Sequence, residues 1–248
     1  MSEKRRRSSL LQDIVNKRAS QDEPTVAVID SDPWRLASFG TMDLLKKLVE
    51  DQGVDVNAKD DRGVTAIVWA IRSGHEKVGE YLLDHGADIE AFGYAGMRAL
   101  HHACNNSHEP CIDLLLERGA KANSTDELGN TALHYAASRG VLNIIVKLLS
   151  KEADPDMANV QGTTPLHKAC LFGQNAVVKK LAQAGADVNK GDKDNNTPLH
   201  IAARGGFASL VSVLLSLGAN PNAMNKGGKT PMALALDDSI AQALSPPS

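Results

Sequence analysis

Residues 164–189, TPLHKACLFGQNAVVKKLAQAGADVN, contain the pattern that decides the fold. The Thr164 side chain can cap free backbone N–H groups, and the proline that follows it suits the first position of a helix. Gly173 and Gly185 end two successive apolar segments, because glycine adopts the left-handed conformation of a helix C-terminus without steric cost. The stretch therefore predicts two short helices joined by a tight turn.

The same pattern recurs every 33 residues along the chain. Small alanines permit close approach of the first helices, and leucines belong to the apolar stripe of the second helices. Polar segments rich in glycine, aspartate and asparagine predict projecting turns between the pairs. Three columns of equivalent positions define the grid: Thr65, Thr131, Thr164, Thr197 and Thr230; Ala70, Ala103, Ala136, Ala169, Ala202 and Ala235; and Leu82, Leu115, Leu148, Leu181 and Leu214.

These residues resemble the ankyrin-repeat family, in particular Thr-Pro-Leu-His at 164–167 and 197–200 and Gly-Ala-Asp-Val-Asn at 185–189. The resemblance implies an all-α solenoid of stacked helix-turn-helix units with projecting β-hairpin-like fingers. It also implies that each unit buries its apolar face against its neighbours, so that the two ends need caps.

The grid predicts the domain organisation. We expect a basic tail, a repeat domain and a short second tail at 1–30, 31–244 and 245–248. Within the repeat domain we expect an N-terminal cap, five fuller repeats and a C-terminal cap at 31–61, 62–225 and 226–244.

Charge and composition exclude several classes of partner. The net charge is −3, and residues 1–20 carry +4, which leaves −7 on the rest and argues against nucleic acid. No apolar run approaches the roughly 20 residues of a membrane span, and the N-terminus lacks the apolar core of a secretory leader. We therefore expect a monomer in the cytoplasm or the nucleus, without integral membrane contact. Its three cysteines are expected to be reduced.

Five histidines and cysteines within eleven residues suggest a metal site: His101, His102, Cys104, His108 and Cys111. The grid favours a structural interpretation, because His101 shares its column with other motif histidines and both cysteines fall in apolar columns. The sequence shows no nucleophile and base that would converge on a substrate pocket, no phosphate-binding loop and no cofactor motif. We predict no metal, no cofactor, no catalytic residue and hence no enzyme.

Ankyrin-repeat proteins generally bind partners through the finger tips and the exposed side of the first helices. In these positions an apolar centre surrounded by arginines resembles a binding hot spot. The candidate residues are Tyr94, Met97, Leu128, Val160, Leu171 and Phe172, with Arg62, Arg72, Arg139 and Arg204 around them. Val64 and Asn130 also fall in these slots. We expect a non-enzymatic adaptor or scaffold that binds an apolar and partly acidic protein on its concave face.

The alternative is a regulatory subunit or an assembly chaperone of an enzyme complex, such as a gankyrin-like proteasome chaperone. Size and repeat count are the features that suggest it, and the residues leave both functions open.

The N-terminal basic cluster has several interpretations: a nuclear-import signal, a contact with anionic membranes, a kinase recognition sequence, or a solvated tail. The kinase interpretation makes Ser8, Ser9 and Ser20 candidate phosphorylation sites. By family resemblance, Asn57 and Asn189 match substrates of an asparaginyl hydroxylase.

Several positions depart from the grid, among them Asn195, which replaces a finger glycine and tolerates left-handed geometry. Arg98 replaces the capping threonine, at an expected cost of about 1 kcal/mol. Ser107 and Glu152 replace glycines, which predicts a reshaped turn at Glu152.

Overall fold

A computed structural model of the chain describes residues 32–245. The candidate phosphorylation sites Ser8, Ser9 and Ser20 lie outside this part. Within it, short helices alternate with loops, and extended pairing is limited to isolated bridges such as Lys59 with Thr65. The expected all-α architecture is confirmed.

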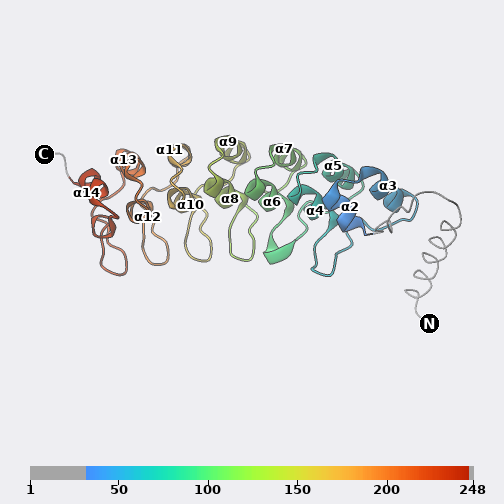
Figure 1. The fold of residues 1–248 in the computed structure, drawn as a ribbon, viewed down its shortest axis with the longest axis horizontal. Coiled ribbons are helices and arrows are strands. Elements are labelled where there is room, and N and C mark those ends of the chain that lie inside the picture. Colours follow the sequence, from blue (N-terminus) through green and yellow to red (C-terminus); the bar gives the residue numbers. More distant parts are fainter. Residues whose placement is uncertain (1–31, 246–248) are drawn as a thin grey trace, which may run out of the picture. The chain divides into compact units, whose positions relative to one another are not determined.

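The helices form pairs along the chain (Figure 1). The first-row helices are α2 (Pro33–Phe39), α4 (Ala66–Arg72), α6 (Ala99–Asn106), α8 (Ala132–Arg139), α10 (Pro165–Leu171) and α12 (Pro198–Arg204). The second-row helices are α3 (Met42–Glu50), α5 (Glu76–Asp84), α7 (Glu109–Glu117), α9 (Leu142–Ser150), α11 (Asn175–Gln183) and α13 (Ala208–Ser216). The described part ends with the 3-10 helix η2 (Met232–Leu234) and the α-helix α14 (Asp238–Leu244). Another 3-10 helix, η1 (Tyr94–Gly96), precedes α6.

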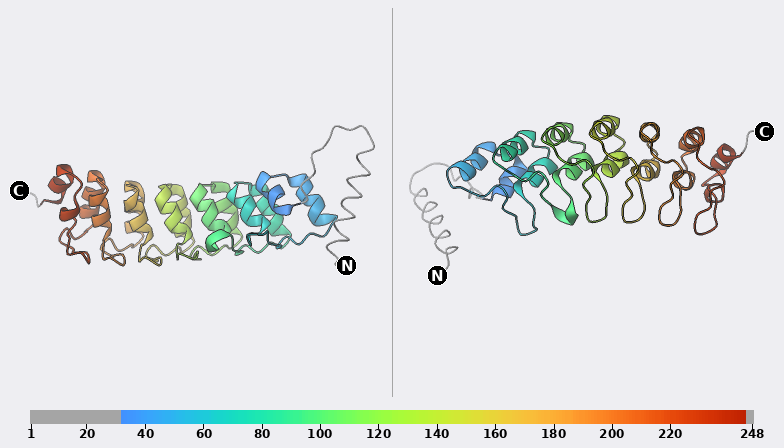
Figure 2. Two further views of the ribbon diagram at one scale, coloured as in Figure 1. Left: turned by 60° about the horizontal axis from the view of Figure 1, so that its bottom comes forward. Right: turned by 180° about the vertical axis from the view of Figure 1, so that it is seen from behind.

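Successive first-row helices pack against one another, and each packs on the second-row helix of its own pair. The fingers project from one side of the row, as Figures 1 and 2 show. We number them finger 1 to finger 6: residues 60–64, 92–97, 126–130, 159–163, 192–196 and 225–229.

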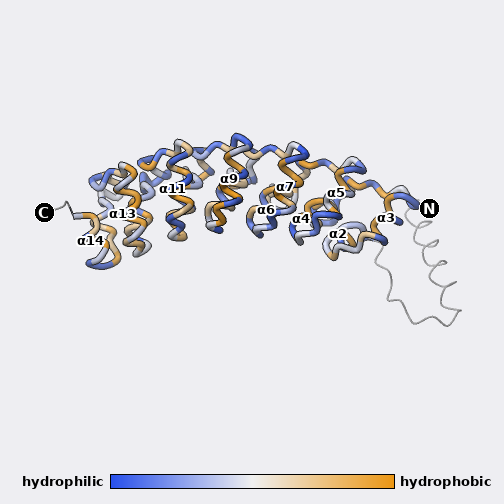
Figure 3. Tube along the Cα trace, turned by 90° about the horizontal axis from the view of Figure 1, so that it is seen from above, coloured by the Kyte–Doolittle hydropathy of each residue, from blue (hydrophilic) through white to orange (hydrophobic). Residues whose placement is uncertain are grey.

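The alanine and leucine columns form the core between pairs. The alanines from Ala70 to Ala202 and the leucines from Leu82 to Leu214 have exposed fractions of 0%. Ala235 is the exception and is partly buried, because η2 replaces a full first helix there. Figure 3 shows apolar segments recurring along the helices between largely hydrophilic loops.

The motif histidines join one repeat to the next. At His134, ring Nδ1 accepts the backbone N–H of Thr131 (3.0 Å) and lies 2.9 Å from its hydroxyl. Nε2 then lies 2.9 Å from the carbonyl oxygen of Thr163 in the next finger. Burial lowers the pKa of His134 to about 4, so the ring is neutral at pH 7 and Nε2–H donates. The expected threonine cap is also present at Thr164, whose hydroxyl accepts the backbone N–H of His167 (3.4 Å).

Arg98 compensates for the missing threonine in another way. Its backbone N–H still donates to Nδ1 of His101 (3.0 Å), as in the other motifs. Its guanidinium donates to the Thr125 carbonyl (2.6 Å) and lies 3.0 Å from the Glu90 carboxylate. These contacts link Arg98 to Glu90 in the loop before finger 2 and to Thr125 just before finger 3.

The residues that replace glycines, Ser107, Glu152 and Asn195, adopt the backbone conformation of those glycines; Asn195 has φ 58°. Ser107 has φ 58° and Glu152 has φ 59°, within the left-handed region. The reshaped turn expected at Glu152 is therefore a glycine-like turn occupied by a residue with a Cβ.

Candidate partner-binding surface

The candidate apolar residues are largely exposed. Tyr94 is 72% exposed, and about half of each of four other side chains is exposed: Leu128, Val160, Leu171 and Phe172. Met97 is half-buried, and the four candidate arginines Arg62, Arg72, Arg139 and Arg204 are exposed. The expected exposure of Val64 and Asn130 was wrong, because both side chains turn inward at the base of a finger. Asn130 donates to Asp126 (3.2 Å) and accepts from Asn159 (2.8 Å).

Eight of the ten candidate residues fall into two groups, and Arg62 on finger 1 and Met97 at the end of finger 2 belong to neither. Tyr94, Leu128 and Val160 lie at the tips of fingers 2, 3 and 4, and we call them the fingertip group. A second group, which we call the helix-end group, lies at the C-terminal ends of first-row helices: Arg72, Arg139, Leu171, Phe172 and Arg204. In a repeat, the first-row helix therefore lies between the fingertip position and the position at the helix end.

The helix-end arginines differ in their contacts. Arg139 is held by Asn105, whose backbone oxygen accepts from Nε (2.6 Å) and whose side-chain oxygen accepts from Nη2 (3.2 Å). Arg72 stacks over Trp69, with Cζ 5.1 Å from the ring centroid. Both guanidinium groups are consequently restricted, which lowers the entropy lost when a partner binds them.

Most fingers share one internal turn. In finger 1, Oδ1 of Asp60 accepts the backbone N–H groups of Arg62 (2.9 Å) and Val64 (2.8 Å). Fingers 3 to 6 repeat this arrangement with Asp126, Asn159, Asp192 and Asn225. Finger 2 has Gly93 in this column and turns instead through η1, where Ala95 has φ 56°.

Backbone hydrogen bonds connect the tips of fingers 2 to 6. Glu127 N–H donates to the carbonyl of Ala95 (3.1 Å), and Val160 N–H donates to that of Leu128 (2.9 Å). Lys193 and Lys226 continue the ladder at 2.9 Å each. Within residues 32–245, no such bond joins fingers 1 and 2. The fingertip group therefore lies on fingers that are hydrogen-bonded to one another, whereas finger 1 has no backbone hydrogen bond to finger 2 among the described residues.

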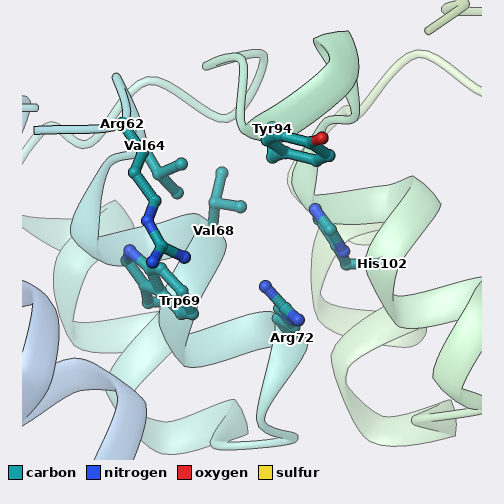
Figure 4. Close-up of a pocket in the computed structure, with 7 residues that line it drawn as sticks. All are labelled: Arg62, Val64, Val68, Trp69, Arg72, Tyr94 and His102. Carbon is teal, nitrogen blue, oxygen red and sulfur yellow. The ribbon is translucent and has the colours of Figure 1, made fainter. Parts of the chain in front are cut away.

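A hollow of about 220 Å³ lies between fingers 1 and 2 (Figure 4). Its lining comes from both fingers and from helices α4 and α6: Arg62, Val64, Val68, Trp69, Arg72, Tyr94 and His102. Three of these, Arg62, Arg72 and Tyr94, are among the partner-binding candidates proposed from the sequence. Trp69 and His102 were not among those candidates. Gly93 could have indicated them, because it interrupts a column that otherwise holds aspartate or asparagine.

The candidate hydroxylation residues bridge neighbouring repeats. The Asn57 amide donates to the Gly86 carbonyl (2.9 Å) and accepts from the Asp88 backbone (2.7 Å). Asn189 makes the equivalent bonds to Gly218 (3.0 Å) and Asn220 (2.7 Å). Both asparagines thus have a structural role in the stack.

The cysteines are free and buried. Burial raises the pKa of Cys111 to about 11 and raises that of Cys104 and Cys170 further. Among the described residues, no three histidine, cysteine or acidic side chains are grouped to hold a metal ion. None of the helices in this part has the length and apolar character needed to cross a membrane.

Comparison with family models matches ankyrin repeats at residues 34–126 and 118–192, and again at 181–235. The chain belongs to the ankyrin-repeat family.

Solved structures agree with this assignment. The ankyrin repeat domain of human ASB11 is 33% identical, with a TM-score of 0.78, covering 88% of this chain and 99% of that one. The ankyrin repeat domain of Bcl-3, described as a unique member of the IkappaB family, is 25% identical, with a TM-score of 0.75, covering 87% and 98%. Comparison with curated proteins gives no significant match.

Proposed function

We propose that the chain is a non-enzymatic adaptor or scaffold that binds a segment of a partner protein across the tips of fingers 2 to 4. The observation that carries this proposal is the fingertip group. Tyr94, Leu128 and Val160 are exposed on fingers that are hydrogen-bonded to one another. Adjacent exposed apolar side chains on a rigid support are typical of a binding surface.

The surroundings of the group favour an apolar and partly acidic partner, and we expect the two to meet in the cytoplasm or the nucleus. Arg62 on finger 1 and Arg72 at the end of α4 are exposed beside Tyr94, and neither forms an ion pair within the described residues. Unpaired surface arginines attract acidic groups and align them. The same surface would serve a regulatory subunit or an assembly chaperone, including one of proteasome assembly.

A matched pair of valines tests this proposal. Val160 and Val146 have similar exposure, but Val146 lies on the second-row helix α9. Peptides selected from a displayed random library on the wild-type chain should bind Val160→Ala and Leu128→Ala about tenfold more weakly, which corresponds to about 1.4 kcal/mol. Val146→Ala should bind them as the wild type does. Equal loss at Val146 and Val160, or no loss at either, would place the binding surface elsewhere.

The helix-end group needs its own variant. If a partner also covers that group, Phe172→Ala should weaken the same peptides. If the peptides bind only the tips, Phe172→Ala should leave their affinity unchanged. Isothermal titration calorimetry of the purified variants measures both.

A further inference from the structure

In the neighbouring repeats, the aspartate at the position of Gly93 holds the finger turn and also accepts a hydrogen bond from the first-row helix. In finger 1, Oδ2 of Asp60 accepts the indole N–H of Trp69 from the first-row helix (2.9 Å). In finger 3, Oδ2 of Asp126 accepts the hydroxyl of Tyr135 in the same way (2.5 Å). His102 occupies the equivalent position of α6, and Gly93 has no side chain to meet it.

His102 consequently has no partner within the described residues, although its ring nitrogens are not closed off from solvent. It is 7% exposed and lines the hollow (Figure 4). Its ring forms no hydrogen bond or ion pair with residues 32–245. Burial, and then the charge of Arg72, lower its pKa to about 4. The ring is therefore neutral at pH 7 and has one N–H to donate.

The chain cannot readily supply the missing acceptor itself. A Cβ on Gly93 would lie 2.9 Å from Cγ1 of Val68 and 3.0 Å from the carbonyl oxygen of Met97. The nearby carboxylate of Asp60 is already occupied by the backbone of its own finger and by Trp69. A fixed acceptor for His102, in place of water, would therefore have to come from outside the repeat domain.

The charge and size of the hollow define the acceptor. Arg62 and Arg72 line it, and neither is paired with a carboxylate of the described residues, so the hollow favours an anion. Its volume of about 220 Å³ exceeds several times the roughly 30 Å³ of one water, which leaves room for a side chain. Trp69 and Tyr94 offer apolar walls for the methylene groups of that side chain.

We propose that the hollow between fingers 1 and 2 binds one aspartate or glutamate side chain of the partner segment, whose carboxylate accepts from His102 and pairs with Arg62 and Arg72. It takes the place that Asp60 and Asp126 occupy in the neighbouring repeats. The proposal rests on the proposed function and deepens it, because Tyr94 belongs both to the fingertip group and to the wall of the hollow.

The chain contains a matched control for the test. Arg72 and Arg204 end α4 and α12 at equivalent grid positions, and both are exposed, but only Arg72 lines the hollow. Displayed random dodecapeptides selected on the wild-type chain should share an acidic residue at one position. Replacing it with glutamine or asparagine in a synthetic peptide should weaken binding to wild type and to Arg204→Met about tenfold. The same replacement should have a clearly smaller effect on Arg72→Met, because one of the two charge partners is already gone.

A spectroscopic readout tests His102 directly. Adding the acidic peptide should shift the ring nitrogen resonances of His102, and adding its uncharged glutamine analogue at equal saturation should shift them less. His102→Phe should bind the acidic peptide and the analogue with more nearly equal affinity. If that variant does not fold, the resonances of the wild-type ring are sufficient.

Several results would overturn the inference. One is an equal effect of the glutamine replacement on wild type and on Arg72→Met. Another is a set of enriched peptides without a shared acidic position; if these are still weakened by Val160→Ala, the hollow proposal fails and the proposed function stands. A phosphoserine peptide that binds more tightly than the glutamate peptide would contradict the choice of a carboxylate. Failure to enrich any peptide would count against both proposals.

Discussion

Motif histidines in this chain act as hydrogen-bonding links between repeats. His134 and His167 each connect a threonine at the start of their own helix with a carbonyl 29 residues later. The repeat grid predicted a structural role for these histidines, but their partners lie in another finger and could not be read from the motif. Thr65 illustrates the point, because Val68 stands where the histidine would be and the buried Thr65 hydroxyl has no partner.

The buried histidines make stability depend on pH. Folded His134 and His102 have pKa values of about 4, against 6.5 for the free side chain. Between these values the unfolded chain binds more protons, so the free energy of unfolding falls as the pH drops from about 6.5 to about 4. At pH 5 the loss is about 2 kcal/mol per histidine. The aspartates with lowered pKa values act in the same direction, but only below about pH 4.

Urea unfolding at about pH 7.5 and pH 5 measures this loss. The midpoint should be lower at pH 5, and His134→Gln should reduce the difference. The exposed His85 provides a control, since His85→Gln should leave the difference unchanged. Equal midpoints at both pH values would show that these rings are not neutral links.

Glu152 is the second residue whose effect can be measured. Its φ of 59° places a residue with a Cβ in a conformation that glycine adopts freely. We expect Glu152→Gly to raise the free energy of unfolding by about 0.5–1 kcal/mol. The reverse change, Gly185→Glu, should lower it, because a Cβ there meets no atom within 4 Å and backbone strain alone is tested. A destabilised Glu152→Gly would indicate that the side chain contributes more than its backbone costs.

At the scale of the element, the helices were predictable and the finger contacts were not. Helix pairs follow from local signals, namely the threonine start, the glycine stop and the apolar columns. The finger ladder depends on backbone bonds between residues about 32 positions apart, which no side-chain pattern records. For the same reason Val64 and Asn130 were placed on the surface, and the hollow behind Gly93 was not foreseen.

The alanine column gives a test at this scale. Ala136 is fully buried in α8, which packs between α6 and α10. Ala136→Leu should force these helices apart and lower the free energy of unfolding by about 1–3 kcal/mol. Ala176→Leu, at an exposed position of α11, should change it little. Chemical denaturation with far-ultraviolet circular dichroism compares the two, and similar values would mean that the column does not set the helix spacing.

Across the whole described array, neighbouring units supply one another's core, while the fingers repeat a single turn that changes only at finger 2. That change coincides with Tyr94, the most exposed apolar side chain of the fingertip group, and with the unpartnered His102. The columns that define the fold are therefore regular, whereas the features to which we assign binding lie where the repeat pattern changes. The family assignment explains the columns, and the departures carry the proposed binding function.

Amide hydrogen exchange of the full chain, with and without a selected peptide, tests the binding claim most directly. The account predicts slower exchange at fingers 2, 3 and 4, residues 92–97, 126–130 and 159–163, and unchanged exchange in α7 and α9 of the second row. Slower exchange confined to the second-row helices, with the fingers unchanged, would contradict it.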